Sequence, residues 1–461
     1  MCNKPGISFH SHLRSKPHAY VPPGAFPLVP GAFYLGPRPT VLHYSMPFLA
    51  SMPSNSSTSQ GRDWIVPFSA IVLAMMTMQM SSLGFSPLLP AIQKEFGISY
   101  SQVGLFTGIY GLAAIALSIP GGMLAQRFGE KRVLLSGLLT VALGLFLLSR
   151  APTFGLGLAS RAVWITGYRT AFVCVMTAVA VTAPAAWRSR AMGILGAMSS
   201  LASVIGAPFG SIIGGKFGWR NGILAFAAMA LLGAFVFWLF YRSRSSAAAD
   251  YQGPHGAVVP PSASAYRNPL VWAMILLGLT NMGGFSSTFF VPFAVKTIFN
   301  LGPTQAAFII STGYITAIFA NLLCGFLADR VNRWGVMIGL MVLLIPASFL
   351  MMTHNLLLFR VATALVISLG LCATNQIYAI ASDVVGGRNV GSVMGIVSLG
   401  GGVFGYVGPQ FLGILRDRTG GFTAGWYFVA TGALIALGVI LLLKRAAEGA
   451  RVVRQPTLVH N

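Results

Sequence analysis

Three arginines fall within long apolar stretches of the sequence: Arg161, Arg169 and Arg360. A charge at bilayer depth costs at least about 2.5–3.5 kcal/mol, so such a residue should face a water-filled cavity or a partner. Arg169 has no counterpart at the matching place in the second half of the chain, where Ser368 is nearest. A guanidinium binds anions through its forked N–H groups. We therefore predict that Arg169 contacts an anionic substrate; bracing of its helix through backbone carbonyls is the alternative.

Arg161 and Arg360 occupy matching places in the two halves of the chain. For this pair we expect a structural role as intramembrane charges, in which each arginine braces its own half near the outer face. Substrate contact is the other interpretation of both residues.

Other reactive groups are scarce. The chain has only eight acidic residues, all in expected loops or at the ends of apolar runs, so a buried acid that carries protons is not favoured. Asp383 comes closest, and an ion pair with Arg388 fits it better. No spacing of histidine, cysteine and acidic residues suggests a metal site, and no phosphate-binding loop is present. We expect no cofactor, no enzyme activity and no ATP-driven pump.

The composition indicates a membrane protein. The sequence is 55% hydrophobic and 8% charged, with a mean hydropathy of +0.75, whereas soluble domains carry about 25% charged residues. Its charge of +22 is spread over the ends of apolar runs, which argues against nucleic acid as a partner and for the lipid bilayer. The expected loops on one side of the membrane, counted together with the carboxyl-terminal tail, hold most of the lysines and arginines that lie outside the apolar runs. By the positive-inside rule both termini are then cytoplasmic.

The chain is internally duplicated. Gly122 and Gly325 have the same separation as Gln102 and Gln305, and Met192-Gly193-Ile194 recurs as 394–396. Apolar runs long enough to cross a bilayer predict twelve spans in two halves of six. The expected parts are a disordered tail or an early start codon at 1–62, a first bundle at 63–241, a cytoplasmic linker at 242–268, a second bundle at 269–445 and a cytoplasmic tail at 446–461.

Two copies of a loop carry a family resemblance. Gly122-Met-Leu-Ala-Gln-Arg-Phe-Gly-Glu-Lys-Arg132 and its weaker copy Gly325-Phe-Leu-Ala-Asp-Arg-Val-Asn-Arg333 resemble the signature of the major facilitator superfamily, in the manner of prokaryotic permeases. The resemblance implies an all-α fold of two six-helix bundles with pseudo-twofold symmetry, and a gating role for this loop. Gln126 replaces the usual aspartate, which weakens the expected latch. The gating residues implied are Gly122, Gln126, Arg127, Gly129, Arg132, Gly325, Asp329, Arg330 and Arg333.

In this family the first, fourth, seventh and tenth spans line a central cavity. Residues 374–376 are all polar and cannot all face lipid. Besides Arg169, the candidate substrate-binding residues are Gln79, Asn281, Asn375, Gln376 and Tyr378.

The sequence thus predicts a monomeric transporter of the plasma membrane that moves a small solute, such as a carboxylate or another organic anion, by alternating access. The coupling, whether to H⁺, to a counter-substrate or to neither, stays open, as do the substrate and direction. An exporter of amphipathic compounds is the first alternative, because phenylalanine is abundant. A receptor or scaffold that transports nothing is the second.

Overall fold

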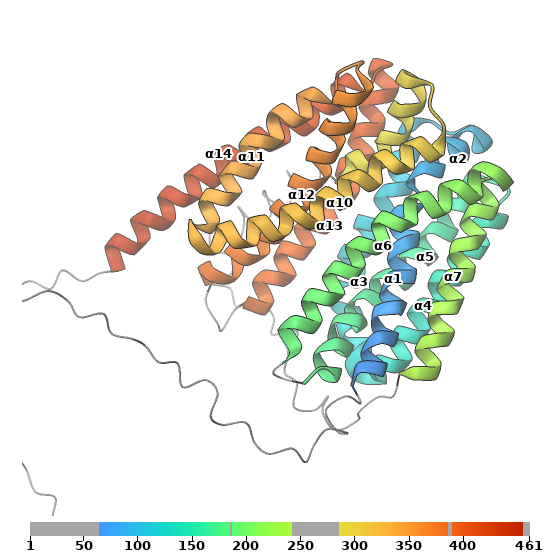
Figure 1. The fold of residues 1–461 in the computed structure, drawn as a ribbon, viewed down its shortest axis with the longest axis horizontal. Helices are drawn as coiled ribbons and strands as arrows, with labels where there is room; N and C mark the ends of the chain where they lie inside the picture. The colour runs from blue at the N-terminus through green and yellow to red at the C-terminus, as the bar shows by residue number, and fades with distance from the viewer. Residues whose placement is uncertain (1–63, 185–186, 242–284, 386–389, 455–461) are drawn as a thin grey trace, which may run out of the picture. The chain divides into compact units, whose positions relative to one another are not determined.

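The computed structural model describes residues 64–184, 187–241, 285–385 and 390–454 (Figure 1). These residues are helical and contain no β-strand. The first half comprises α1 (Ile65–Gly84), the short 3-10 helix η1 (Ser86–Leu88), α2 (Leu89–Phe96), α3 (Tyr100–Phe128), α4 (Glu130–Arg150), α5 (Phe154–Thr182), α6 (Arg188–Phe217) and α7 (Trp219–Phe240). The second half comprises a helix at Phe285–Phe299, α10 (Pro303–Arg330), α11 (Arg333–Leu350), α12 (Leu356–Val385), α13 (Val390–Thr419) and α14 (Thr423–Arg454).

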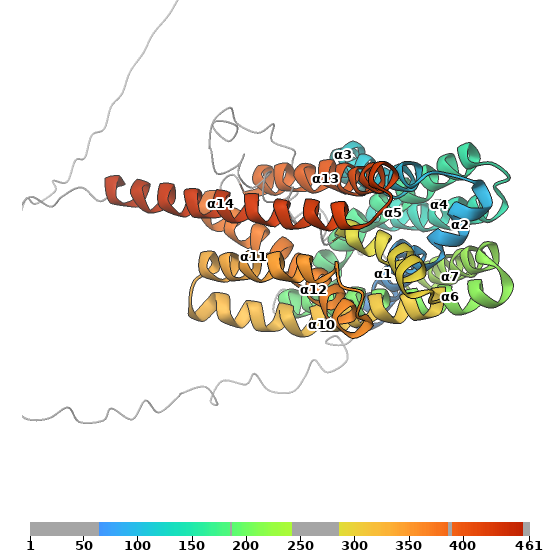
Figure 2. The same cartoon turned by 90° about the horizontal axis from the view of Figure 1, so that it is seen from above.

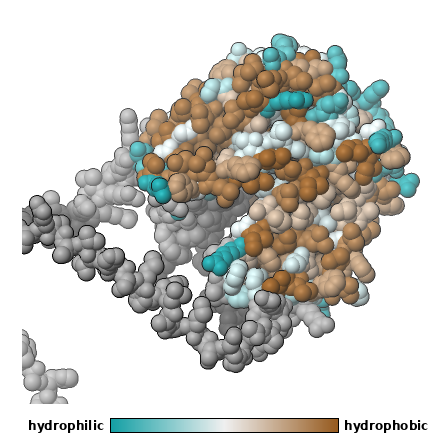
Figure 3. Space-filling model, in the orientation of Figure 1, coloured by the Kyte–Doolittle hydropathy of each residue, from teal (hydrophilic) through white to brown (hydrophobic). Residues whose placement is uncertain are grey.

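The helices have the length and composition of membrane spans. Within the described ranges, nine segments are long and apolar enough to cross a bilayer. Figure 3 shows mostly hydrophobic residues along the helices and hydrophilic ones toward their ends. The predicted all-helical membrane fold is therefore confirmed. The count of twelve spans stays a prediction, because the start of the expected seventh span lies outside the described residues, as do the expected tail at 1–62 and the linker.

Local sequence explains where several helices begin and end. Gly129 has a φ of 83°, a conformation open to glycine but strained for other residues, and it separates α3 from α4. The Asn332 side chain accepts hydrogen bonds from the amides of Trp334 and Gly335, at 2.7 and 3.2 Å, and so caps α11. Thr153 caps α5 in the same way. Such caps satisfy amides that the first helical turn leaves without partners.

The helices form two bundles, one from each half of the chain (Figure 1). In the first, α4 packs against α5 and α7, and α1 packs against α6 and α7. In the second, α10 packs against α12, and α11 packs against α12 and α14. Large aromatic residues such as Trp164, Phe226 and Trp426 are buried within the bundles.

Two seams join the bundles. One is formed by α3 and α13, which lie side by side in Figure 2, and the other by α6 and α10. The duplication relates α3 to α10 and α6 to α13, so the two seams are equivalent under the internal repeat. Small residues allow the close approach: a Cβ on Gly111 would stand 2.2 Å from the carbonyl oxygen of Gly402.

The described contacts between the bundles run from one end of the molecule to about mid-helix. We call this end, formed by the turns at residues 97–99, 218, 300–302 and 420–422, the contact end. Between this end and mid-helix, the Ser86 hydroxyl donates to the carbonyl of Thr288 at 2.7 Å. On the second seam the Ser311 hydroxyl donates to the carbonyl of Val204 at 2.8 Å. We call the opposite end, with the turn at Gly129, the Gly129 end.

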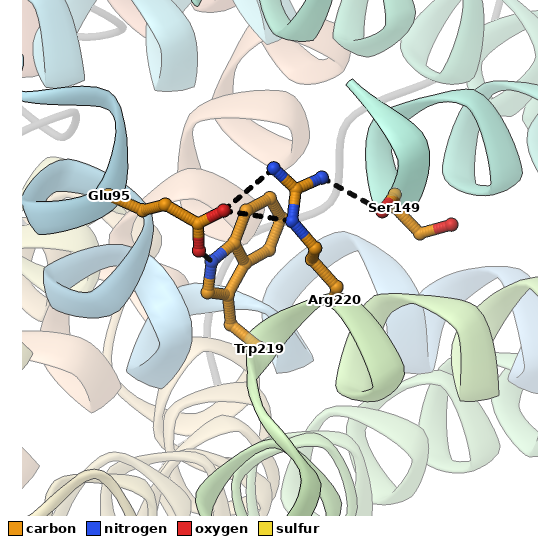
Figure 4. A network of polar contacts seen from close by, with 4 residues as sticks. All are labelled: Glu95, Ser149, Trp219 and Arg220. Atoms are coloured by element: carbon orange, nitrogen blue, oxygen red, sulfur yellow. Dashed lines mark hydrogen bonds and ion pairs between the residues drawn. The ribbon is translucent and has the colours of Figure 1, made fainter. Parts of the chain in front are cut away.

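A polar network holds three helices of the first bundle together at the contact end (Figure 4). The Arg220 guanidinium forms an ion pair with Glu95 at 2.7 Å and donates to the carbonyl of Ser149 at 3.0 Å. The indole N–H of Trp219 donates to the other oxygen of Glu95. The network joins the ends of α2 and α4 to the start of α7, and all its members belong to one bundle.

Candidate functional site

Arg169 lies midway along α5 and is half-buried. Its Nη1 donates to the Tyr110 hydroxyl at 3.3 Å, and its guanidinium carbon stands 5.2 Å from the centre of the Tyr110 ring. Within the described part of the chain, no carboxylate pairs with Arg169, and that hydroxyl is its hydrogen-bond acceptor. A cation at this depth thus keeps donors available for a ligand.

The neighbouring residue, Tyr168, is fully buried and connects α5 to α1. Its hydroxyl donates to the side-chain oxygen of Gln79, which is itself half-buried. The ring of Tyr168 stacks on that of Phe172 at 6.2 Å, because residues four apart share a helix face. The Tyr168 and Tyr110 ring centres are 5.9 Å apart.

A fourth helix, from the second bundle, completes the surroundings. Phe285, at the start of the helix Phe285–Phe299, contacts the Tyr110 ring with centres 5.2 Å apart. We call Gln79, Tyr110, Tyr168, Arg169 and Phe285 the Arg169 cluster. It draws on α1, α3, α5 and the second bundle, so it lies where the two halves meet.

The polar residues predicted on α12 form a separate group. The Asn375 amide donates to the side-chain oxygen of Asn321 on α10 at 2.7 Å, and Asn375 is exposed. Gln376 is buried, and its side-chain oxygen has no described hydrogen-bond donor. No described hydrogen bond links this group to the Arg169 cluster. Asn281 lies outside the described residues, and the Tyr378 side chain is not among those described.

Sequence reasoning selected Arg169 and Gln79, which the structure brings together through Tyr168. It missed Tyr110 and gave Tyr168 no role. A signal was present for Tyr168, because it shares a helix face with Phe172 in a span that also carries Arg169. Nothing in the sequence pointed to Tyr110, which lies on another helix.

Arg161 and Arg360 have different surroundings. Arg161 is completely buried, with its guanidinium carbon 4.1 Å from the ring centre of Phe85 and 3.9 Å from that of Trp164. None of its three side-chain nitrogens has an acceptor among the described residues. Arg360 is exposed and lines a shallow apolar groove beside Phe308. Arg161 is therefore enclosed and Arg360 is not, and the structural role predicted for both residues stays a prediction.

The two loop copies both lie at the Gly129 end. After Gly129, the buried Glu130 accepts from the Tyr241 hydroxyl at 3.2 Å, which ties the start of α4 to the end of α7. Lys131 donates to the carbonyl of Tyr241. The described arginines of the two loops, except the partly buried Arg333, are exposed: Arg127, Arg132 and Arg330. The side chains of Gln126 and Asp329 are not among those described, although both residues lie on described helices.

Comparison with known proteins identifies the family. The model of the Major Facilitator Superfamily matches residues 68–297 and 281–458. The chain belongs to this superfamily. It is a multi-pass membrane transporter and not an enzyme.

Relatives within the superfamily include named anion transporters. The chain is 22% identical over 377 residues to the "Probable nitrate transporter NarT" of Staphylococcus epidermidis, covering 80% of this chain and 93% of that one. It is 24% identical over 381 residues to the "Probable sulfoacetate transporter SauU" of Cupriavidus necator, covering 77% and 87%. A solved bacterial homologue of the human lysosomal transporter Spinster, in an inward-facing and occupied conformation, shares the fold. That likeness has a TM-score of 0.68 at 18% identity, covering 85% of this chain and 98% of that one.

Proposed function

We propose that this superfamily member moves a small anion across the plasma membrane by alternating access, and that Arg169 is the main charge contact for the anion. The observation that carries the proposal is the half-buried guanidinium of Arg169, which has a phenol beside it and, among the described residues, no carboxylate. The similarity to transporters named for nitrate and sulfoacetate supports the same class of substrate.

The chemistry of the cluster suits an oxyanion. Two parallel N–H groups of the Arg169 fork match two oxygens of a carboxylate, sulfonate or nitrate. The Tyr110 hydroxyl, which now accepts from Arg169, can donate to the same anion. The rings of Tyr168 and Phe285 limit water near the charge, and lower local polarity strengthens each of these contacts. Gln79 holds Tyr168 in place from α1.

The arrangement of the seams supports alternating access. Bundles joined from the contact end to mid-helix can rock about a central site, so that the anion reaches Arg169 from one side at a time. Because most loop lysines and arginines lie on the other side, we propose that the contact end faces outward and both termini face the cytoplasm. Under this proposal the loops at Gly122–Arg132 and Gly325–Arg333 gate the cytoplasmic side.

The test is uptake of radiolabelled nitrate and sulfoacetate, and of a small dicarboxylate, into proteoliposomes that contain the purified protein. We expect at least one of these anions to accumulate, and Arg169→Gln to raise its half-saturation concentration roughly ten- to over a hundred-fold. This follows because one charge-assisted contact contributes about 1.5–3 kcal/mol.

Arg150→Gln is the matched control. Arg150 is exposed at the end of α4, and its loss removes the same charge far from the cluster. The half-saturation concentration of the anion for the Arg150→Gln variant should match that for the unmodified protein. Full transport by reconstituted Arg169→Gln would contradict the proposal.

One observation favours a second candidate, export of amphipathic compounds. The rings of Tyr110, Phe172 and Phe285 are only partly buried and lie in or beside the Arg169 cluster, where a planar organic molecule can contact them. This function predicts that a host overproducing the protein becomes resistant to aromatic dyes, and that Arg169→Gln leaves this resistance intact.

A further inference from the structure

The amino terminus of α3 is held by a residue of the other bundle. Asp417, near the end of α13, accepts the amide N–H of Tyr100 at 2.9 Å and that of Ser101 at 2.7 Å. The Ser101 hydroxyl donates to the same carboxylate. Both oxygens of this one carboxylate therefore accept hydrogen bonds across the seam at the contact end.

The local sequence explains why these two amides are available. Ser99 and Gln102 form a reciprocal capping pair, in which the Ser99 amide donates to the Gln102 side chain at 2.9 Å and the Gln102 amide donates to Ser99 at 3.2 Å. This pair leaves the amides of Tyr100 and Ser101 without a partner in their own bundle. A negative charge is also favoured at the amino terminus of a helix, where the backbone dipole is positive.

The surroundings of Asp417 are tightly packed against α3. The Arg416 guanidinium carbon stands 4.9 Å from the ring centre of Tyr100 and 4.6 Å from that of Phe422. A Cβ on Gly413 would lie 2.2 Å from the carbonyl oxygen of Tyr100, so the two backbones touch beside the carboxylate. The contact end cannot open along this seam while Asp417 keeps both amides.

We propose that Asp417 is a latch that keeps the contact end closed, and that its release from the amino terminus of α3 is required for this end to open. The proposal deepens the proposed function, because it rests on alternating access and names the residue that biases it. Asp417 is exposed to water, so its carboxylate and the two freed amides can be hydrated when the bundles separate. Hydration of these groups offsets part of the loss of the hydrogen bonds, so the latch can be released in each cycle.

Glu95 provides a matched comparison. It is also a carboxylate at the contact end with several hydrogen bonds, but its partners Trp219 and Arg220 belong to its own bundle. Loss of Glu95 should loosen the first bundle without changing the balance between closed and open states.

The experiment measures the opening directly, without substrate or transport. All four native cysteines are replaced, and nitroxide labels are attached to the full-length chain in nanodiscs through Leu156→Cys and His354→Cys. Both positions are exposed at the contact end, one on each bundle. Double electron–electron resonance then measures the distance between the two labels, which reports how far apart the bundles lie at this end.

We expect one predominant short distance in the protein with Asp417 intact. Asp417→Ala should raise the ratio of the longer-distance to the shorter-distance population by roughly tenfold, which corresponds to about 1.4 kcal/mol. Asp417→Asn should give a smaller rise, because the neutral amide retains one acceptor oxygen and the volume of the side chain. Glu95→Gln should leave the distribution unchanged.

An unchanged distribution in both Asp417 variants would overturn the proposal, as would an equal shift in Glu95→Gln. If Asp417→Ala elutes as aggregate in size-exclusion chromatography, the isosteric Asp417→Asn decides the question. Failure of the protein to transport any anion would not alter these distances. Conversely, an Asp417 variant without effect would leave the role of Arg169 untouched, so the two proposals can fail separately.

Discussion

Arg161 and Arg169 lie about two turns apart on α5, yet the protein treats their charges in opposite ways. Arg161 is 0% exposed and lies against the rings of Phe85 and Trp164. Arg169 is half-buried, donates to the hydroxyl of Tyr110 and lies over its ring. The first charge is stabilised by aromatic faces, which no ligand can reach in this conformation. The second keeps hydrogen-bond donors available where the two bundles meet.

Charge alone does not identify a binding residue within a membrane. Both arginines are costly at this depth, and both are retained. What separates them is whether the surrounding side chains enclose the guanidinium or leave part of it accessible. This difference predicts stability effects around Arg161 and affinity effects around Arg169.

The largest expected effect is on the enclosure of Arg161. Trp164→Ala should lower the free energy of unfolding by about 3–5 kcal/mol, because it removes a fully buried ring and one face of the Arg161 enclosure. Thermal unfolding of the purified protein measures this loss. Trp238→Ala is the control, because Trp238 is 55% exposed and should change the unfolding temperature little. Equal effects at the two tryptophans would contradict the enclosure.

The same substitution at both arginines should sharpen the comparison. Arg161→Lys should lower the free energy of unfolding by about 1–2 kcal/mol, because an ammonium loses the flat stacking on Trp164 and is harder to dehydrate. Arg169→Lys should leave stability unchanged and raise the half-saturation concentration for the anion roughly tenfold, since the forked geometry is lost. Paired unfolding and uptake measurements test both, and an exchange of the two outcomes would reverse our assignment of roles.

The smallest expected effect concerns the partner of Arg169. Tyr110→Phe keeps the ring but removes the hydroxyl that accepts from Arg169. One hydrogen bond contributes about 0.5–1.5 kcal/mol, so the half-saturation concentration should change by roughly two- to tenfold. The unfolding temperature should stay the same, because the ring contacts with Tyr168 and Phe285 remain. Uptake in proteoliposomes measures the change, and an unaltered affinity would remove Tyr110 from the site.

The helical membrane fold, the duplication and the choice of Arg169 could all be predicted from the sequence. These follow from properties that act locally or repeat along the chain: apolar runs of spanning length, glycines at turns and a charge that stands out against its neighbours. The candidate Gln79 could also be selected this way, because a polar side chain is conspicuous in an apolar span.

The surroundings of each of these residues, by contrast, depend on how distant helices pack together. Tyr110 reaches Arg169 from α3, and Asp417 reaches the amino terminus of α3 from the other bundle. Arg161 and Arg360 look equivalent in the repeat, yet one is enclosed by rings and the other exposed. The sequence sets the spacing at which polar and apolar side chains recur along each helix. The packing of distant helices sets which neighbour a side chain meets and whether water reaches it.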